Sequence, residues 1–216
     1  MNAFRKVFTV FQPGDEAFDL LDKEEKSARL LGTQVLIIIG FSMFYGMVMG
    51  SFNGLMQAIS SGLKLPVLIL LSVFICFPAF YVIQYMLGSK LVLSKMAKIV
   101  LSGFVVFATI ILSFMPIVLF FMITGNNYSF LKLLHVAIFI FAGIFGMRTI
   151  IQGLKFSCEK RNVYPKLGIQ IFKIWIIIFS FVSIQLAWNL RPFVGSRDLP
   201  FQLFREKEGN FYLAVV

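Results

Sequence analysis

Acidic residues, histidine and cysteine are all scarce in this sequence, and their scarcity limits the chemistry that the protein can perform. The chain of 216 residues contains ten Asp and Glu, two Cys and a single His. A protein metal site takes several ligands of these types, so the lone His135 predicts no metal centre. The acidic residues all lie outside the long apolar runs. A proton relay across a membrane would need an acidic residue inside one of these runs. We therefore expect a protein that is not an enzyme and that uses no cofactor.

Charge of either sign is also scarce, whereas apolar residues dominate. Charged residues make up 14% of the chain, against ~25% in ordinary soluble domains, and 59% of the residues are hydrophobic. Three long runs, Leu30–Leu63, Leu65–Ser89 and Ile99–Leu131, contain no Asp, Glu, Lys, Arg or His. A helix needs about 20 apolar residues to cross a hydrocarbon core of about 30 Å. The sequence therefore predicts an all-α, polytopic membrane protein with five spanning helices, at approximately 34–55, 65–88, 99–123, 131–154 and 167–190.

The distribution of lysine and arginine predicts the orientation of these spans. Fourteen of the 20 cations lie before the first span or in the second and fourth connections, and six lie on the other side. The positive-inside rule then places residues 1–33 in the cytoplasm and the tail, residues 191–216, outside a bacterial inner membrane. Arg148 lies within snorkelling reach of the inner interface. The cations are dispersed over short connections, which favours the lipid bilayer, and no nucleic acid, as the partner of the net charge of +10.

Small residues recur at every fourth position at the end of the first predicted span. The ladder consists of Ser42, Gly46, Gly50, Gly54, Ala58 and Gly62. In lipid, a stripe of small residues lets two helix backbones approach closely. We expect this stripe to pack against another helix of the same chain, with contact to a second copy and a thin wall beside a pore as alternatives.

Two prolines lie deep within predicted spans. Pro78 and Pro116 each remove a backbone hydrogen bond and should kink their helices. A gate or a broken-helix binding site is the functional interpretation, and a packing kink is the structural one, which we favour.

Polar residues gather on the predicted outer side of the membrane. This outer polar cluster consists of Asn53, Gln57, Asn126, Asn127, His135, Gln185 and Asn189. The cluster is expected either to line a polar mouth or to form hydrogen bonds between helices, and we favour the second. His135 falls in the first turn of the fourth predicted span, near the outer surface, which predicts an interfacial residue and not a ligand.

Both ends of the chain carry aromatic residues of the kind that anchor a protein at the interface. The sequence "FRKVFTVF" predicts an amphipathic helix on the inner leaflet. The tail is broken by prolines and charges and should dock on the outer interface or on a partner. The predicted interfacial anchors are Phe4, Phe8, Phe11, Trp188, Phe201, Phe204 and Tyr212.

Two stretches of the sequence support a resemblance to a known family. The N-terminal "FRKVFTVFQPGDEAFDLL" and the second connection "LGSKLVLSKMAKIVLSG", which precedes a proline-bearing third span, resemble bacterial Yip1-type membrane proteins. The resemblance covers roughly Phe4–Phe121 and implies a five-helix bundle with a cytoplasmic N-terminus. Eukaryotic members of the family are adaptors in vesicle trafficking, and no functional residue carries over from them.

Two functions fit this sequence. The first is a scaffold or assembly subunit that associates with itself or with other membrane proteins. The second is an oligomeric pore or channel, or an effector that perturbs the membrane. We favour the scaffold because no predicted span has a polar face along its whole length.

Overall fold

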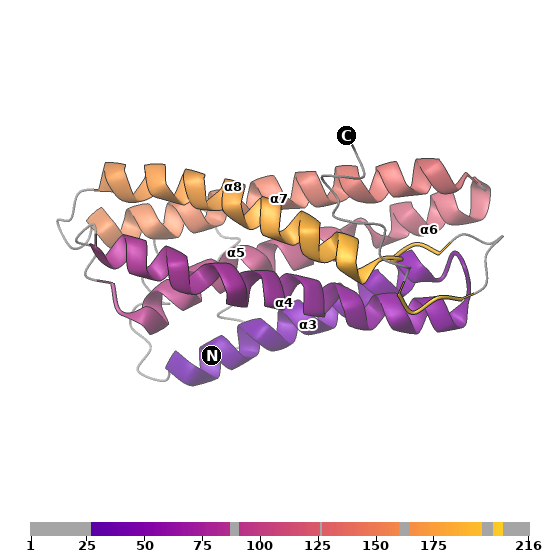
Figure 1. Ribbon diagram of the computed structural model, residues 1–216, viewed down its shortest axis with the longest axis horizontal. Helices are drawn as coiled ribbons and strands as arrows, with labels where there is room; N and C mark the ends of the chain where they lie inside the picture. The colour runs from indigo at the N-terminus through magenta and orange to yellow at the C-terminus, as the bar shows by residue number, and fades with distance from the viewer. Residues whose placement is uncertain (1–26, 87–90, 126, 160–164, 196–200, 205–216) are drawn as a thin grey trace.

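The computed structural model describes residues 27–86, 91–125, 127–159, 165–195 and 201–204, and within these ranges all regular secondary structure is helical (Figure 1). With the labels of Figure 1, the helices are α3 (Ser27–Gly50), α4 (Leu55–Met86), α5 (Leu93–Ser113), α6 (Met115–Thr124), α7 (Tyr128–Glu159) and α8 (Pro165–Leu190). Five stretches are long and apolar enough to cross a membrane, namely α3, α4, α5 together with α6, α7 and α8. This is the number of spanning helices that the sequence predicts.

The helices run side by side along the long axis of the molecule (Figure 1). Helix α3 packs against both α4 and α5, α5 packs against α7, and α8 packs against α4 and α7. Helices α4 and α5 hardly touch each other. The bundle therefore closes through α3 on one side and through α7 and α8 on the other.

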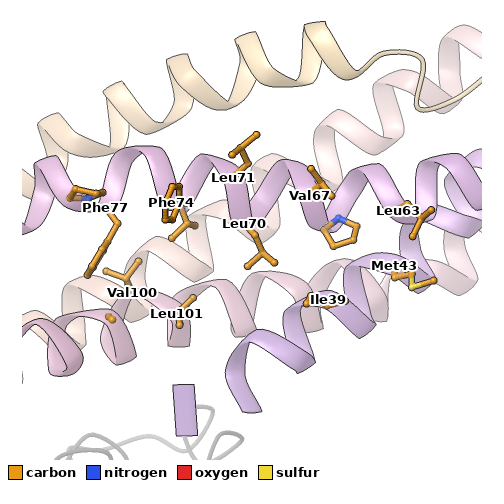
Figure 2. Close-up of a pocket in the computed structure, with 14 residues that line it drawn as sticks. Ile39, Met43, Leu63, Val67, Leu70, Leu71, Phe74, Phe77, Val100 and Leu101 are labelled. Carbon is orange, nitrogen blue, oxygen red and sulfur yellow. The ribbon is translucent and has the colours of Figure 1, made fainter. Parts of the chain in front are cut away.

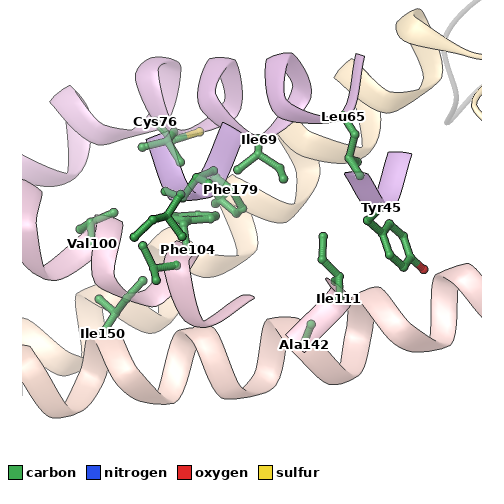
Figure 3. Close-up of a cluster of buried hydrophobic side chains, with 14 of the residues drawn as sticks. Tyr45, Leu65, Ile69, Cys76, Val100, Phe104, Ile111, Ala142, Ile150 and Phe179 are labelled. Atoms are coloured by element: carbon green, nitrogen blue, oxygen red, sulfur yellow. The ribbon is translucent and has the colours of Figure 1, made fainter. Parts of the chain in front are cut away.

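An aromatic cluster fills the interior where α4, α5 and α8 meet. Phe80 and Phe172 are fully buried, and their ring centroids lie 5.5 Å apart. Trp175 stacks on Phe172, lies tilted beside Phe80, and donates its indole N–H to the carbonyl oxygen of Cys76 at 2.9 Å. Figure 3 shows the neighbouring part of this core, which includes Phe104 and Phe179. The ring centroids of these two residues lie 5.3 Å apart. Large apolar side chains also cover the outside of the bundle, which suits a lipid environment better than water.

The first hairpin differs from the sequence prediction. Helix α3 ends at Gly50, and α4 begins at Leu55, so the predicted first span of 34–55 is wrong at its C-terminal end. Gly54 occupies the turn with φ of +151°, a conformation that glycine alone adopts readily. The Asn53-Gly54 pair is a turn signal that the absence of charge in this region concealed. Lys64, which the prediction placed in a connection, lies inside α4 and is buried.

This turn also divides the small-residue ladder, which therefore does not form one stripe on a single helix. Ser42, Gly46 and Gly50 belong to α3, Gly54 lies in the turn, and Ala58 and Gly62 belong to α4. Gly46 and Gly50 of α3 lie against Gln57, Ser61 and Gly62 of α4, so the expected contact with another helix of the same chain is present, and it joins the two arms of the hairpin.

The two predicted kink prolines have different surroundings. Pro116 lies in the first turn of α6, directly after the break between α5 and α6 at Phe114. Proline cannot donate the hydrogen bond that would continue α5, and the Phe114 N–H is shared between the carbonyls of Ile110 and Ile111 at 3.2 Å. Pro78 lies inside α4, and the helix continues on both sides of this proline.

Candidate functional site

The α3–α4 hairpin is held by backbone-to-backbone contact at its glycines. A Cβ atom added at Gly46 would lie 2.5 Å from the Ser61 carbonyl oxygen, and one added at Gly50 would overlap the Gln57 carbonyl oxygen. A Cβ atom at Gly62 would lie 2.6 Å from the Met47 side chain. At Gly46 and Gly50 only glycine fits while the backbones stay where they are, whereas at Gly62 the Met47 side chain would have to move. This contact fixes the position of the first turns of α4.

Those first turns carry a polar stripe on one face of the helix. Gln57, Ser61 and Lys64 follow one another at spacings of four and three residues, which places them above one another. They are 1%, 0% and 6% exposed. Buried polar groups need hydrogen-bond partners, and the stripe finds its partners far away in the sequence.

The partners are carbonyl oxygens of the chain that follows α8, here called the C-terminal strap and defined as residues 191–195 and 201–204. Gln57 Nε2 donates to the Pro192 oxygen at 2.8 Å, and Ser61 Oγ donates to the Phe193 oxygen at 2.5 Å. Lys64 Nζ donates to the Pro192 oxygen at 3.3 Å and also to the Leu203 oxygen. The same ammonium group lies 4.9 Å from the ring centroid of Phe204, within the range of a cation–π contact.

Helix α7 and the hairpin turn complete the attachment of the strap. The Tyr128 hydroxyl donates to the Val194 oxygen at 2.9 Å, and its ring stacks on Phe52 with centroids 6.2 Å apart. Gly195 lies against Asn53, because a Cβ atom at this glycine would come within 2.7 Å of the Asn53 Cβ. The strap therefore touches three separate parts of the bundle at the end that carries the α3–α4 turn, here called the turn end.

The contacts that hold the strap, here called the clamp, have a structural role. A non-helical segment next to a membrane bundle needs donors for its backbone carbonyls, because lipid supplies none. Four side chains provide them: Gln57, Ser61, Lys64 and Tyr128. No carboxylate in the described part of the chain contacts Lys64, so its charge is stabilised by carbonyl dipoles and an aromatic ring. The described residues hold no group of three His, Cys, Asp or Glu suited to a metal ion.

His135 is buried inside the helix bundle. It is 4% exposed, and its Nδ1 atom lies 2.8 Å from the Tyr45 hydroxyl oxygen, with the two rings edge to face. Helix α7 begins at Tyr128, before the predicted start of the fourth span, so His135 lies two turns inside the helix. The residue is therefore buried between helices and joins α7 to α3, and its position near the membrane interface stays a prediction.

The other members of the predicted outer polar cluster have separate positions. Asn53 and Gln57 reach the strap, whereas the Asn127 side chain caps α7 by accepting hydrogen bonds from the N–H groups of Ser129 and Phe130. On α8, Gln185 is half-buried and Asn189 is exposed. Asn126 lies outside the described residues. The cluster is thus divided between the strap, a helix cap and the surface of α8.

The predicted interfacial anchors are described only in part. Trp188 lies at the end of α8 with the Arg191 guanidinium 3.5 Å from its ring centroid. Phe201 and Phe204 are 44% and 56% exposed in the strap. The remaining anchors lie outside the described residues: Phe4, Phe8, Phe11 and Tyr212.

Two further contacts escaped the sequence prediction. Gln34 donates from Nε2 to the Ser102 hydroxyl at 2.8 Å and to the Lys98 carbonyl at 3.1 Å, which joins α3 to α5. Gly103 and Gly146 let α5 and α7 cross closely, since a Cβ atom on either would lie within 2.7 Å of the other's carbonyl oxygen. Each helix offers one glycine to this crossing, so no repeated spacing marks it.

The polar stripe itself could have been found from the sequence. Its spacing becomes visible once α4 is started at Leu55 instead of 65.

Comparisons with known proteins add nothing to these contacts, because no family model, curated protein or solved structure matches the chain. The resemblance to Yip1-type proteins therefore depends on the quoted stretches alone.

Proposed function

We propose that this chain is a non-enzymatic integral membrane protein that serves as a scaffold or assembly subunit. The observation that carries the proposal is the clamped strap. Three buried donors and the half-buried Tyr128 hold its backbone, while Phe201, Leu203 and Phe204 are 44%, 53% and 56% exposed. A fixed segment that presents adjacent apolar side chains is a surface for a protein partner.

The proposed setting is a bacterial inner membrane, with the N-terminus in the cytoplasm. The excess of lysine and arginine on the N-terminal side supports this orientation. Five spans then put the turn end and the strap outside the cell membrane. The partner surface would therefore face the external compartment. The resemblance to Yip1-type proteins is compatible with an adaptor role of this kind.

The arrangement of buried polar groups favours a scaffold over a pore. In the described residues they form separate contacts, among them Gln34 with Ser102, Tyr45 with His135, and the α4 stripe with the strap. Apolar side chains such as Ile38, Val105 and Ile111 fill the interior of the bundle. A water-filled path needs a continuous polar lining.

Site-specific photocrosslinking tests the proposal in cells. We expect benzoylphenylalanine in place of Leu203 to give a discrete protein adduct, whereas the same residue at Leu36, which is 70% exposed on α3, gives none. The adduct should disappear when Lys64→Met removes the charge that holds the strap. Purified protein in planar bilayers should carry no current. Single-channel currents together with no adduct from Leu203 would replace the scaffold with the pore.

A further inference from the structure

The sides of the bundle differ in what they present to a surrounding lipid. Figure 2 shows an apolar groove of about 740 Å³, in which Leu70 and Phe77 on α4 face Ile39 on α3 and Val100 and Leu101 on α5. The lining of this groove includes no ionisable side chain, and such a wall accepts any hydrocarbon surface equally. The exposed face of α7 is different, because it changes from apolar to cationic along its length.

Five exposed side chains follow one another on this face of α7 at spacings of three and four residues, namely Phe141, Ile144, Arg148, Gln152 and Lys155. These spacings place them on one side of the helix. The order along α7 is therefore two apolar side chains, then a guanidinium group, then an amide and an ammonium group. A phospholipid has the same order, from its acyl chains through its phosphate to the outer part of its headgroup.

Arg148 lies at the depth where the hydrocarbon should end. Tyr128, whose hydroxyl binds the strap at the turn end, precedes Arg148 by 20 residues. That separation is about 30 Å of helix, which is the thickness of the hydrocarbon core. Phe141 and Ile144 then lie beside acyl chains, whereas Gln152 and Lys155 lie about 6 Å and about 10 Å farther out than Arg148, at the level of the headgroups.

The charge of Arg148 has no protein partner in the described part of the chain. The side chains of Arg148 and Lys155 make no ion pair, hydrogen bond or cation–π contact there. A guanidinium group has five N–H donors, and hydrocarbon supplies no acceptor for them. A lipid phosphate does, because two of its oxygens match the planar fork of the guanidinium group.

Lys155 determines which headgroup is favoured. A choline or ethanolamine headgroup would bring its own cation close to this ammonium group, which is repulsive. A glycerol headgroup carries no such cation, and its hydroxyls suit the Gln152 amide. The surrounding sequence is also positive, since the segment from Arg148 to Lys173 has one carboxylate, Glu159, and six cations: Arg148, Lys155, Lys160, Arg161, Lys166 and Lys173. Such a segment attracts lipids of net negative charge.

We propose that the exposed face of α7 binds one phospholipid of net negative charge, with the phosphate on Arg148, an acyl chain along Phe141 and Ile144, and the headgroup beside Gln152 and Lys155. The site goes beyond the scaffold role and rests only on the membrane setting of the proposed function. It lies about 30 Å along α7 from the residue that holds the strap, so a lipid here and a partner on the strap bind independently.

Native mass spectrometry of the full chain tests the site. The protein is stripped of lipid in detergent and titrated with dioleoyl phosphatidylglycerol or with dioleoyl phosphatidylcholine. Arg148→Gln removes the charge, and Arg29→Gln is the matched control, because Arg29 is an exposed arginine near the start of α3 and its loss lowers the net charge equally. We expect one tightly bound phosphatidylglycerol per parent chain, about tenfold lower affinity in Arg148→Gln, and the parental affinity in Arg29→Gln.

Two further measurements separate the site from a general effect on folding. Thermal unfolding without lipid should give the parental temperature for Arg148→Gln, because the side chain is exposed. Phosphatidylglycerol should then raise the unfolding temperature of the parent and of Arg29→Gln more than that of Arg148→Gln. Lys155→Gln leaves the phosphate contact in place and should narrow the preference for phosphatidylglycerol over phosphatidylcholine.

Equal phosphatidylglycerol affinity of Arg148→Gln and Arg29→Gln would overturn the proposal, as would a parent that binds the two lipids alike. Release of the lipid by an excess of glycerol phosphate, which has no acyl chain, would overturn the role of Phe141 and Ile144. A carbodiimide crosslink from Lys155 to a carboxylate of another protein chain would also overturn the proposal, because protein would then cover this face. The photocrosslink from Leu203 does not involve Arg148, so failure of the lipid site and failure of the scaffold are distinguished.

Discussion

The two halves of the α3–α4 pair face the same solvent and have opposite packing. Near the turn, Gly46, Gly50 and Gly62 bring the backbones into direct contact. Farther along, Ile39 and Leu70 face each other across a groove of about 740 Å³. The polar stripe of the closed half binds the strap and not α3, and lipid does not reward the burial of apolar surface as water does. Residue size therefore decides whether the two helices close or stay apart.

The largest effect should come from breaking the closed half. We expect Gly50→Ile to lower the free energy of unfolding by about 3 kcal/mol or more, because the new side chain would meet the Gln57 backbone. Thermal or SDS-induced unfolding of the purified protein measures the loss. Gly40→Ile is the matched control on α3, since nothing lies within 4 Å of a Cβ atom there. Equal stability of the two variants would show that the hairpin is not held by close backbone contact.

The α5–α7 crossing tests whether the same rule holds outside the hairpin. Gly146→Ile should cost roughly 1–3 kcal/mol, because the side chain would push against the Gly103 carbonyl oxygen. Gly143→Ile on the same helix has open space around its Cβ atom and should be tolerated. The same unfolding measurement applies, and a larger loss from Gly143→Ile would contradict the crossing.

Removing the charge of Lys64 should loosen the strap without unfolding the closed half beside it. Lys64→Met keeps the bulk of the side chain but deletes the donor to Pro192 and Leu203. Hydrogen bonds to charged groups contribute about 1.5–3 kcal/mol, so chymotrypsin should cleave after Phe201 or Phe204 roughly tenfold faster or more.

Global stability should change little in this variant, because an apolar residue replaces a buried cation without leaving another charge unpaired. The control is Lys173→Met, where the lysine is exposed on α8 and is not one of the residues that hold the strap. Unchanged cleavage in Lys64→Met, or collapse of the whole fold, would show that the clamp has been misjudged.

The smallest effect concerns the polar contact beside the glycines. Tyr45→Phe removes the hydroxyl that pairs with His135 and should lower the unfolding free energy by about 0.6 kcal/mol, the average for a hydrogen bond between membrane helices. Tyr85→Phe, at a residue that is 64% exposed, should have no measurable effect. A loss in Tyr45→Phe as large as that in Gly146→Ile would mean that polar contacts, and not residue size, hold α3 in place.

The class of the protein and its number of spanning helices follow from the sequence alone. Runs such as Leu65–Ser89 and Ile99–Leu131 are long enough to cross a bilayer and contain no Asp, Glu, Lys, Arg or His. The structure has five helices that are long and apolar enough to cross one. This inference is local, because it depends only on the thickness of the hydrocarbon and on the need to satisfy every backbone group within a helix. The positions of charged residues predicted the helix ends poorly. Lys64, which was expected in a connection, is buried inside α4, and the actual turn at Gly54 carries no charge.

The contacts that make the candidate site were decided by the tertiary structure. Gln57 and Lys64 bind carbonyls that lie 135 and 128 residues away in the sequence, and His135 pairs with Tyr45 across 90 residues. A backbone carbonyl leaves no mark in a sequence, so the partner of a polar side chain stays unknown until the chain is folded. The groove likewise depends on how far two helices diverge. The sequence determined which segments are helical and apolar, because those properties belong to short stretches, and only the fold decided which of them meet.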